Sequence, residues 1–296
     1  MKVSGLGAIL LAGSLLPACG QMTVEVTQDQ DQFLEGESLP VAVRIANRSG
    51  QTLRLGAAED WLSFTIESRE GPVVSKIGEA PVKGEFDLES SEIATKRVDL
   101  VSYFAPMAPG HYAIVATVHV KEWNRDIASP PRYFDVIDGT RLWEQEVGVP
   151  TAPGVSNAAP ELRKYILQQA NYLRSQVRLY LRITDSYGKT YRVFPIGNLV
   201  SFSRPEPQVD RFSRLHVLFQ NGPTRFSYSS FDLDGTLLAR QTYDYVGARP
   251  RLRVDDDGAI SVFGGVRRTT ASDVPPPVFE NNLRPLTTNQ SAQTKP

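Results

Sequence analysis

Cysteine, histidine and long apolar runs are scarce in this chain of 296 residues. The one cysteine, Cys19, lies near the N-terminus, so a chain processed there has neither a disulfide nor a thiol for catalysis. Of the three histidines, His111 and His119 fall on one expected strand, about 26 Å apart at about 3.3 Å per residue, which is too far to share a metal ion. We therefore expect neither a metal site nor a cofactor.

The first twenty residues resemble a secretory signal. Lys2 precedes an apolar run over residues 3–16 that is too short to span a bilayer. The stretch LPAC, ending at Cys19, resembles a bacterial lipobox, while the small residues around it also permit cleavage before Gln21. We expect export to the periplasm, the outer membrane or the medium, with membrane attachment only through a lipid on Cys19.

The formal net charge of −1 conceals two halves of opposite sign. Residues 21–160 contain 12 Lys and Arg against 21 Asp and Glu, a net of −9, whereas residues 161–268 contain 17 against 10, a net of +7. Either the halves attract each other, or the basic half meets an anionic partner. The expected partner is a protein or an anionic envelope polymer, and not a nucleic acid.

Alternating apolar and polar residues predict an all-β fold in both halves. Clear examples are MTVEVT over residues 22–27, PVAVRIAN over 40–47 and HYAIVATVHV over 111–120. About seven short strands over residues 21–137 predict an antiparallel β-sandwich.

The segment from 138 to 160 contains clusters of proline and small residues, which favour a linker. It also holds Trp143, a large ring expected to be buried against a neighbouring domain, so we expect the two modules to dock. After the second module, over 161–268, the composition predicts a disordered tail over 269–296.

The second module is predicted to be rich in antiparallel hairpins. Its first segment, ELRKYILQQANY, is compatible with a helix, but RLYLRITD over 178–185 alternates as a strand does. The pairs Asn221-Gly222, Asp234-Gly235 and Asp257-Gly258 separate further alternating segments, and such pairs supply the positive φ of tight hairpin turns.

Two segments resemble immunoglobulin-like modules of secreted bacterial proteins, including the BsuPI proteinase-inhibitor type. They are FLEGESLPVAVRIANRSGQTLRL, over 33–55, and APGHYAIVATVHV, over 108–120. The resemblance implies an immunoglobulin-like β-sandwich in which Tyr112 forms a tyrosine corner. It also supplies an alternative function, a proteinase inhibitor.

The segment SFDLDGTLLA, over 230–239, matches the signature of the haloacid dehalogenase superfamily. That resemblance implies Asp232 as a nucleophile and Asp234 as general acid and base. The signature works at the end of a buried parallel strand, yet SYSS before it alternates with aromatics, and only 64 residues follow Asp232. We therefore predict a hairpin turn, and a hydrolase is only a remote alternative.

Three arginines form the best candidate for anion binding. Arg249, Arg251 and Arg253 recur at every second position, which on a strand places them on one face about 7 Å apart, opposite Leu252 and Val254. The same pattern also describes an ordinary solvated face.

Four aromatic residues are candidates for stacking on sugar rings: Phe226, Tyr228, Tyr243 and Tyr245. The competing interpretation is core packing, because Ser227 and Ser229 occupy the alternate positions and are expected to face solvent.

Taken together, these features predict an exported, non-enzymatic binding or scaffolding protein of the bacterial cell envelope. The fold expected is all-β, with an immunoglobulin-like sandwich followed by a second antiparallel module.

Replacing Cys19 with Ser tests the anchoring hypothesis. If Cys19 carries a lipid, the variant moves from the membrane fraction to the soluble fraction, because its only anchor is lost. A wild-type protein that is already soluble and starts at Gln21 would show that the lipid anchor is absent.

Overall fold

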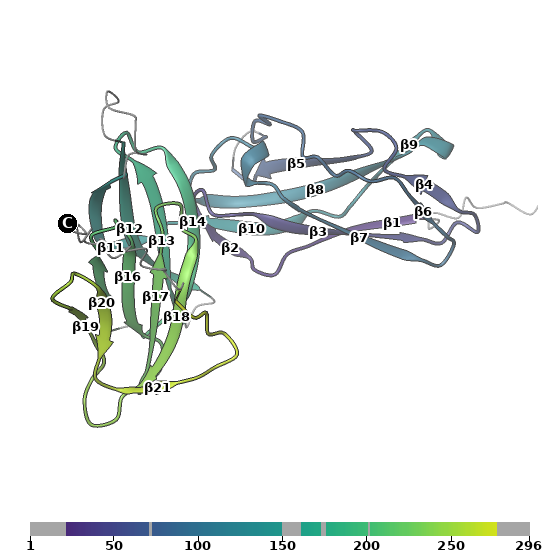
Figure 1. The fold of residues 1–296 in the computed structure, drawn as a ribbon. Coiled ribbons are helices and arrows are strands. Elements are labelled where there is room, and N and C mark those ends of the chain that lie inside the picture. Colours follow the sequence, from purple (N-terminus) through teal and green to yellow (C-terminus); the bar gives the residue numbers. More distant parts are fainter. Residues whose placement is uncertain (1–21, 71–72, 150–160, 173–175, 201, 277–296) are drawn as a thin grey trace, which may run out of the picture. The chain divides into compact units, whose positions relative to one another are not determined.

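The computed structural model describes residues 22–70, 73–149, 161–172, 176–200 and 202–276. The chain divides into two compact units, Met1–Asp138 and Gly139–Pro296. Both are built from strands, and the described helical turns are two short 3-10 segments, η1 (Val101–Tyr103) and η2 (Lys121–Trp123) (Figure 1). The predicted all-β fold is confirmed.

The first unit contains two main sheets. The smaller has the order β1 (Met22–Thr27), β3 (Pro40–Asn47) and β7 (Ile93–Asp99). The larger has the order β2 (Gln32–Leu34), β10 (Arg132–Ile137), β8 (Gly110–Val120) and β5 (Leu62–Ser68), with β9 (Arg125–Ala128) also paired to β8. Strands β4 (Leu53–Leu55) and β6 (Phe86–Leu88) form a separate ribbon. All pairs are antiparallel except β2 with β10.

One apolar core lies between these sheets. Alternate residues of β3 and of β8 are buried in it, among them Val43, Ile45 and Ile114, which are 0% exposed. This pattern is the period of two that the sequence predicts for half-buried strands. The Tyr112 hydroxyl donates a hydrogen bond of 2.7 Å to the carbonyl oxygen of Ala108, the local contact expected of a tyrosine corner. The unit is thus a β-sandwich.

The second unit also contains two antiparallel sheets. One has the order β11 (Thr140–Gly148), β12 (Leu162–Tyr172), β13 (Gln176–Asp185) and β14 (Thr190–Leu199). The other has the order β15 (Glu206–Val209), β16 (Leu215–Gln220), β17 (Arg225–Phe231), β18 (Leu237–Asp244) and β21 (Val266–Arg268). Strands β19 (Arg251–Val254) and β20 (Ile260–Phe263) form an additional hairpin (Figure 1).

These elements form three layers. The main core lies between the two sheets and includes Leu181 and Phe219. A smaller core lies on the other face of the second sheet, where Phe226 and Leu218 pack with Leu252 of the β19–β20 hairpin. The central strands of the second sheet are therefore buried on both faces.

The predicted linker is wrong over residues 140–148. These residues form β11, which pairs antiparallel with β12, and Trp143 packs against the main core of the second unit. The burial of Trp143 therefore arises within its own unit and gives no reason to expect docking. The remaining predicted linker residues, 150–160, lie outside the described residues.

The helical alternative for the start of the second module is also wrong, because residues 162–172 form β12. This strand pairs with β13 on one side and, over residues 162–169, with β11 on the other, so the sheet satisfies most of its backbone groups. Tertiary pairing overrides the local helix propensity of ELRKYILQQA.

The predicted tail begins too early. The Val274 and Arg240 main chains exchange hydrogen bonds of 2.9 and 3.0 Å, and Asp273 pairs with Arg267. Residues 277–296 lie outside the described residues. Within the described ranges, none of the helical segments has the length and apolar character required to cross a membrane.

A buried polar chain fixes part of the second sheet. The Tyr228 hydroxyl donates to Nδ1 of His216 at 2.8 Å, and Nε2 of His216 donates to the Asp210 carboxylate at 3.3 Å. Burial lowers the pKa of His216, although the hydrogen bond to Asp210 opposes this shift. Burial also raises the pKa of Tyr228 to about 12. Neutral His216, with its proton on Nε2, satisfies both contacts.

Acid should therefore destabilise the second unit through His216. The unfolded chain takes up this proton near the ordinary pKa of about 6.5, while the folded chain takes it up only at lower pH, so stability falls as the pH drops below about 6.5. The loss is at most about 1.4 kcal/mol per pH unit from this group.

Urea unfolding at pH 7.5 and 5.5 measures the effect. His216→Gln should lose less stability between these pH values than wild type, whereas Tyr228→Phe, which keeps the histidine, should retain the loss. Equal losses in wild type and His216→Gln would contradict this role.

Candidate functional site

Four hairpin turns of the second unit share one geometry: Asp185–Lys189, Asp210–Arg214, Asp232–Thr236 and Asp255–Ala259. In each, the N–H of the first residue donates to the carbonyl of the fifth at 2.8 to 3.1 Å, and the N–H of the fourth donates back at 2.8 to 3.3 Å. The fourth residue has a positive φ, between 61° and 87°, and is glycine in all but the second turn. This arrangement closes an antiparallel hairpin.

The DLDGTL segment is one of these turns. The Oδ1 atom of Asp232 accepts hydrogen bonds from the N–H groups of Asp234 at 3.0 Å and Thr236 at 2.7 Å. The segment joins the antiparallel strands β17 and β18. The predicted hairpin turn is confirmed, and the carboxylate that the dehalogenase resemblance implies as nucleophile holds backbone groups instead.

Each histidine of the sequence is paired with an aspartate. Cross-strand partners place His111 Nδ1 2.7 Å from Asp135 Oδ1, and His119 Nδ1 2.7 Å from Asp126 Oδ1. Together with the buried His216 contact, these pairs account for all three rings. Among the described residues, no group of three or more His, Cys, Asp and Glu side chains is arranged to hold a metal ion.

The four predicted stacking residues do not form an exposed platform. Phe226 and Tyr228 are buried in the smaller core, Tyr243 is partly buried beside them, and Tyr245 is 47% exposed. Core packing is therefore confirmed for Phe226 and Tyr228, but the expectation that Ser229 faces solvent is wrong. Ser229 is buried at 1% exposure, because β17 has a packed layer on each face.

Two of the three predicted arginines line a groove of about 1010 Å³ in the second unit. Arg249 and Arg251 share its lining with Arg204, whereas Arg253 does not contribute. Arg253 instead pairs with Asp255 at 3.2 Å and lies over the Phe263 ring. Of the two residues expected opposite the arginines, Leu252 is buried, whereas Val254 is 56% exposed.

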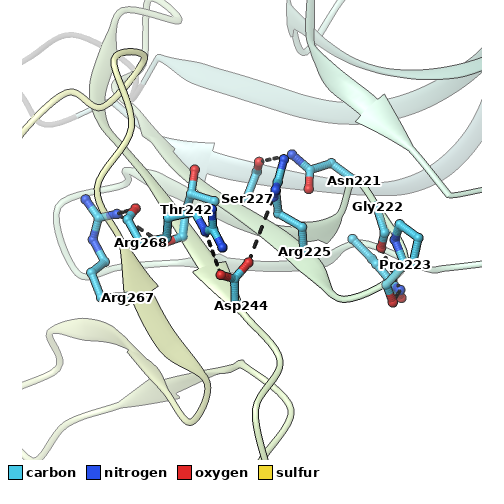
Figure 2. A network of polar contacts seen from close by, with 10 residues as sticks. Asn221, Gly222, Pro223, Arg225, Ser227, Thr242, Asp244, Arg267 and Arg268 are labelled. Atoms are coloured by element: carbon cyan, nitrogen blue, oxygen red, sulfur yellow. Dashed lines mark hydrogen bonds and ion pairs between the residues drawn. The ribbon is translucent and has the colours of Figure 1, made fainter.

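The groove arginines differ from the neighbouring ones in their ion pairing. Arg225 and Arg268 share Asp244 at 3.9 and 2.6 Å (Figure 2). Within the described part of the chain, no carboxylate forms an ion pair with Arg204, Arg249 or Arg251. The groove therefore has an uncompensated positive charge.

One carboxylate, that of Glu206, lines the same groove. Its Oε1 accepts a hydrogen bond of 3.2 Å from the N–H of Leu252. With three arginines and one glutamate, the lining has an excess of positive charge and favours an anionic ligand.

A network of polar contacts holds the wall that contains Gln220 and Pro223. The Gln220 amide nitrogen donates to the carbonyl oxygens of Gly222 at 3.0 Å and Pro223 at 2.9 Å. Asn221 Nδ2 donates to the Ser227 hydroxyl at 2.6 Å in the same turn (Figure 2). These contacts fix the loop between β16 and β17 without using a groove arginine.

Close packing against Gly265 positions the segment 249–251, which carries two of the groove arginines. Pro250 is buried between Arg249 and Arg251, and a Cβ added to Gly265 would lie 2.6 Å from the Pro250 ring. Gly265 has a φ of +69° and donates its N–H to the carbonyl of Ala248 at 3.0 Å. Only glycine fits here without displacing the segment that leads into β19.

Sequence reasoning missed Arg204 and Phe202, which join Arg249 in the groove from 45 and 47 positions earlier in the chain. No periodic pattern connects positions so far apart. The available signal was the Arg-Pro-Glu-Pro stretch at 204–207, whose prolines indicate a rigid segment rather than a hairpin. The lipidation candidate, Cys19, lies outside the described residues.

Comparison with known proteins provides little similarity. No protein-family model matches the chain, and no match was found among curated proteins. Among solved structures, the sporulation control protein Spo0M from Bacillus subtilis aligns with a TM-score of 0.30 and 10% identity, covering 58% of this chain and 83% of that chain. This similarity is too low to establish a shared function.

Two substitutions distinguish a turn from a catalytic site in the DLDGTL segment. Gly235 has a φ of +76°, and an added Cβ would lie 2.9 Å from side-chain atoms of Ile183 and Phe194. Gly235→Val should therefore cost about 1 to 3 kcal/mol of stability. Asp232→Asn keeps the Oδ1 acceptor and should change stability by about 0.5 kcal/mol or less.

Thermal melting of both variants checks the stabilities. A parallel assay with Mg²⁺ and a generic phosphate ester checks for turnover. Phosphatase activity in the pure protein that disappears with Asp232→Asn would contradict the structural role of this aspartate.

Proposed function

We propose that this chain is an exported, non-enzymatic binding protein of the bacterial cell envelope, and that the groove of the second unit contacts an anionic partner. The signal-like N-terminus supports export, with Cys19 as the proposed anchor. The supporting observation for binding is the set of three arginines in one groove without acidic partners among the described residues.

The chemistry of the groove favours binding over turnover. Guanidinium groups keep their proton and their charge near neutral pH, so they hold carboxylates and phosphates without acting as acids or bases. The first aspartate of each of the four turns and the three histidines are engaged in structural contacts.

The volume of the groove and the placement of its arginines indicate the form of the partner. A groove of about 1010 Å³ is larger than a single inorganic anion requires. Arg249 and Arg251 are separated by one residue and line the same groove, so they can contact two charges of one ligand. We infer a partner with repeated negative charge, such as an anionic envelope polymer.

Replacing Arg251, the first residue of β19, together with Arg249, two residues before it, tests this function. Arg249→Ala with Arg251→Ala should weaken binding to immobilised polygalacturonate by about tenfold or more, because charge-assisted contacts are lost. Arg253→Ala is the matched control, since Arg253 lies on the same segment, pairs with Asp255 and lies outside the groove lining.

Binding should weaken as salt rises, because attraction between exposed charges is screened beyond about 8 to 10 Å at physiological ionic strength, and added salt shortens this distance. Neutral dextran should not bind. If Arg253→Ala weakens binding as much as the double variant, or if the wild type binds no polyanion, the groove is not the site.

A further inference from the structure

We propose that the ligand of the groove is an acidic sugar, a carboxylate- or phosphate-bearing glycan whose ring stacks on Phe202. This inference rests on the proposed anion-binding function and specifies its ligand. It replaces the four aromatic candidates of the sequence, which the structure does not bring together as an exposed surface.

Phe202 is the exposed ring of the groove. It belongs to the lining and is 93% exposed, although a phenylalanine ring is ordinarily covered in a folded domain. Pro205, Pro207 and Pro223 line the same groove and add flat apolar surfaces. An aromatic face with its negative π density packs against the C–H face of a pyranose ring.

The polar groups of the groove match a ligand that has hydroxyl groups as well as charge. The Gln220 amide nitrogen is bound to two carbonyls, which leaves its Oε1 to accept a ligand hydroxyl. An inorganic anion or a simple carboxylate would not use this amide oxygen together with an apolar ring.

An acidic peptide fits the groove less well. Peptides commonly bind by adding a strand to an exposed sheet edge, where backbone N–H groups pair with the ligand. The edge strand β15 contains Pro207, and Pro205 lies just before it, so this wall lacks two of the required donors. Recognition must then depend on side chains, and these suit an acidic sugar.

Isothermal titration of the full exported protein with four probes tests this inference. The probes are tetragalacturonate, mannose 6-phosphate, tetraglutamate and maltotetraose. We expect one or both acidic sugars to bind, and the stronger one identifies a carboxylate or a phosphate as the charged group. Tetraglutamate and maltotetraose should bind more weakly by about tenfold or more, because each lacks either the ring or the charge.

Phe202 supplies the decisive variants, and its exposure makes it replaceable without unfolding the domain. Phe202→Ala should weaken acidic-sugar binding by about tenfold, Phe202→Trp should restore it, and Arg253→Ala should leave it unchanged. Unchanged binding in Phe202→Ala, or equal binding of tetraglutamate, would overturn the sugar assignment while the anion site stands. If no anion binds, or if maltotetraose binds as well as tetragalacturonate, the proposed function fails as well.

Discussion

The second unit depends on satisfying backbone N–H groups in tight hairpin turns. Three of its turns begin with an aspartate whose carboxylate accepts two N–H groups of the turn, at positions 185, 210 and 232. A turn fixed in this way sets the register of the flanking strands, and register decides which side chains face the core. The same constraint makes these aspartates structural, including the one in the dehalogenase-like segment.

Strand register also determines which side chains face the groove. In the β19–β20 hairpin, Leu252 faces the smaller core, so Arg251 and Arg253 point outward. Ion pairing distinguishes the arginines of the unit from one another. Arg253, Arg267 and Arg268 each pair with an aspartate, whereas the groove arginines have no such partner among the described residues. Net charge alone would not have distinguished these roles.

Much of the fold was predictable, since alternation and Asp-Gly pairs report directly on strands and turns. The strand β11 was hidden because proline and small residues surround it, and β12 was ambiguous because its apolar spacing also fits a helix. Ser229 was misjudged because a sequence does not reveal a second packed layer. The stripe of Arg249 and Arg251 was visible, whereas Arg204 and Phe202 reach the groove through tertiary folding.

The central claim is that the groove holds an acidic ligand. A ¹H–¹⁵N NMR titration of the full protein with tetragalacturonate tests it most directly, because it locates the contact surface without substitutions. The account predicts that the largest shifts occur at the side-chain Nε–H groups of Arg204, Arg249 and Arg251 and at the Gln220 amide. Shifts confined to the turn at Asp232, or to the first unit, would contradict it.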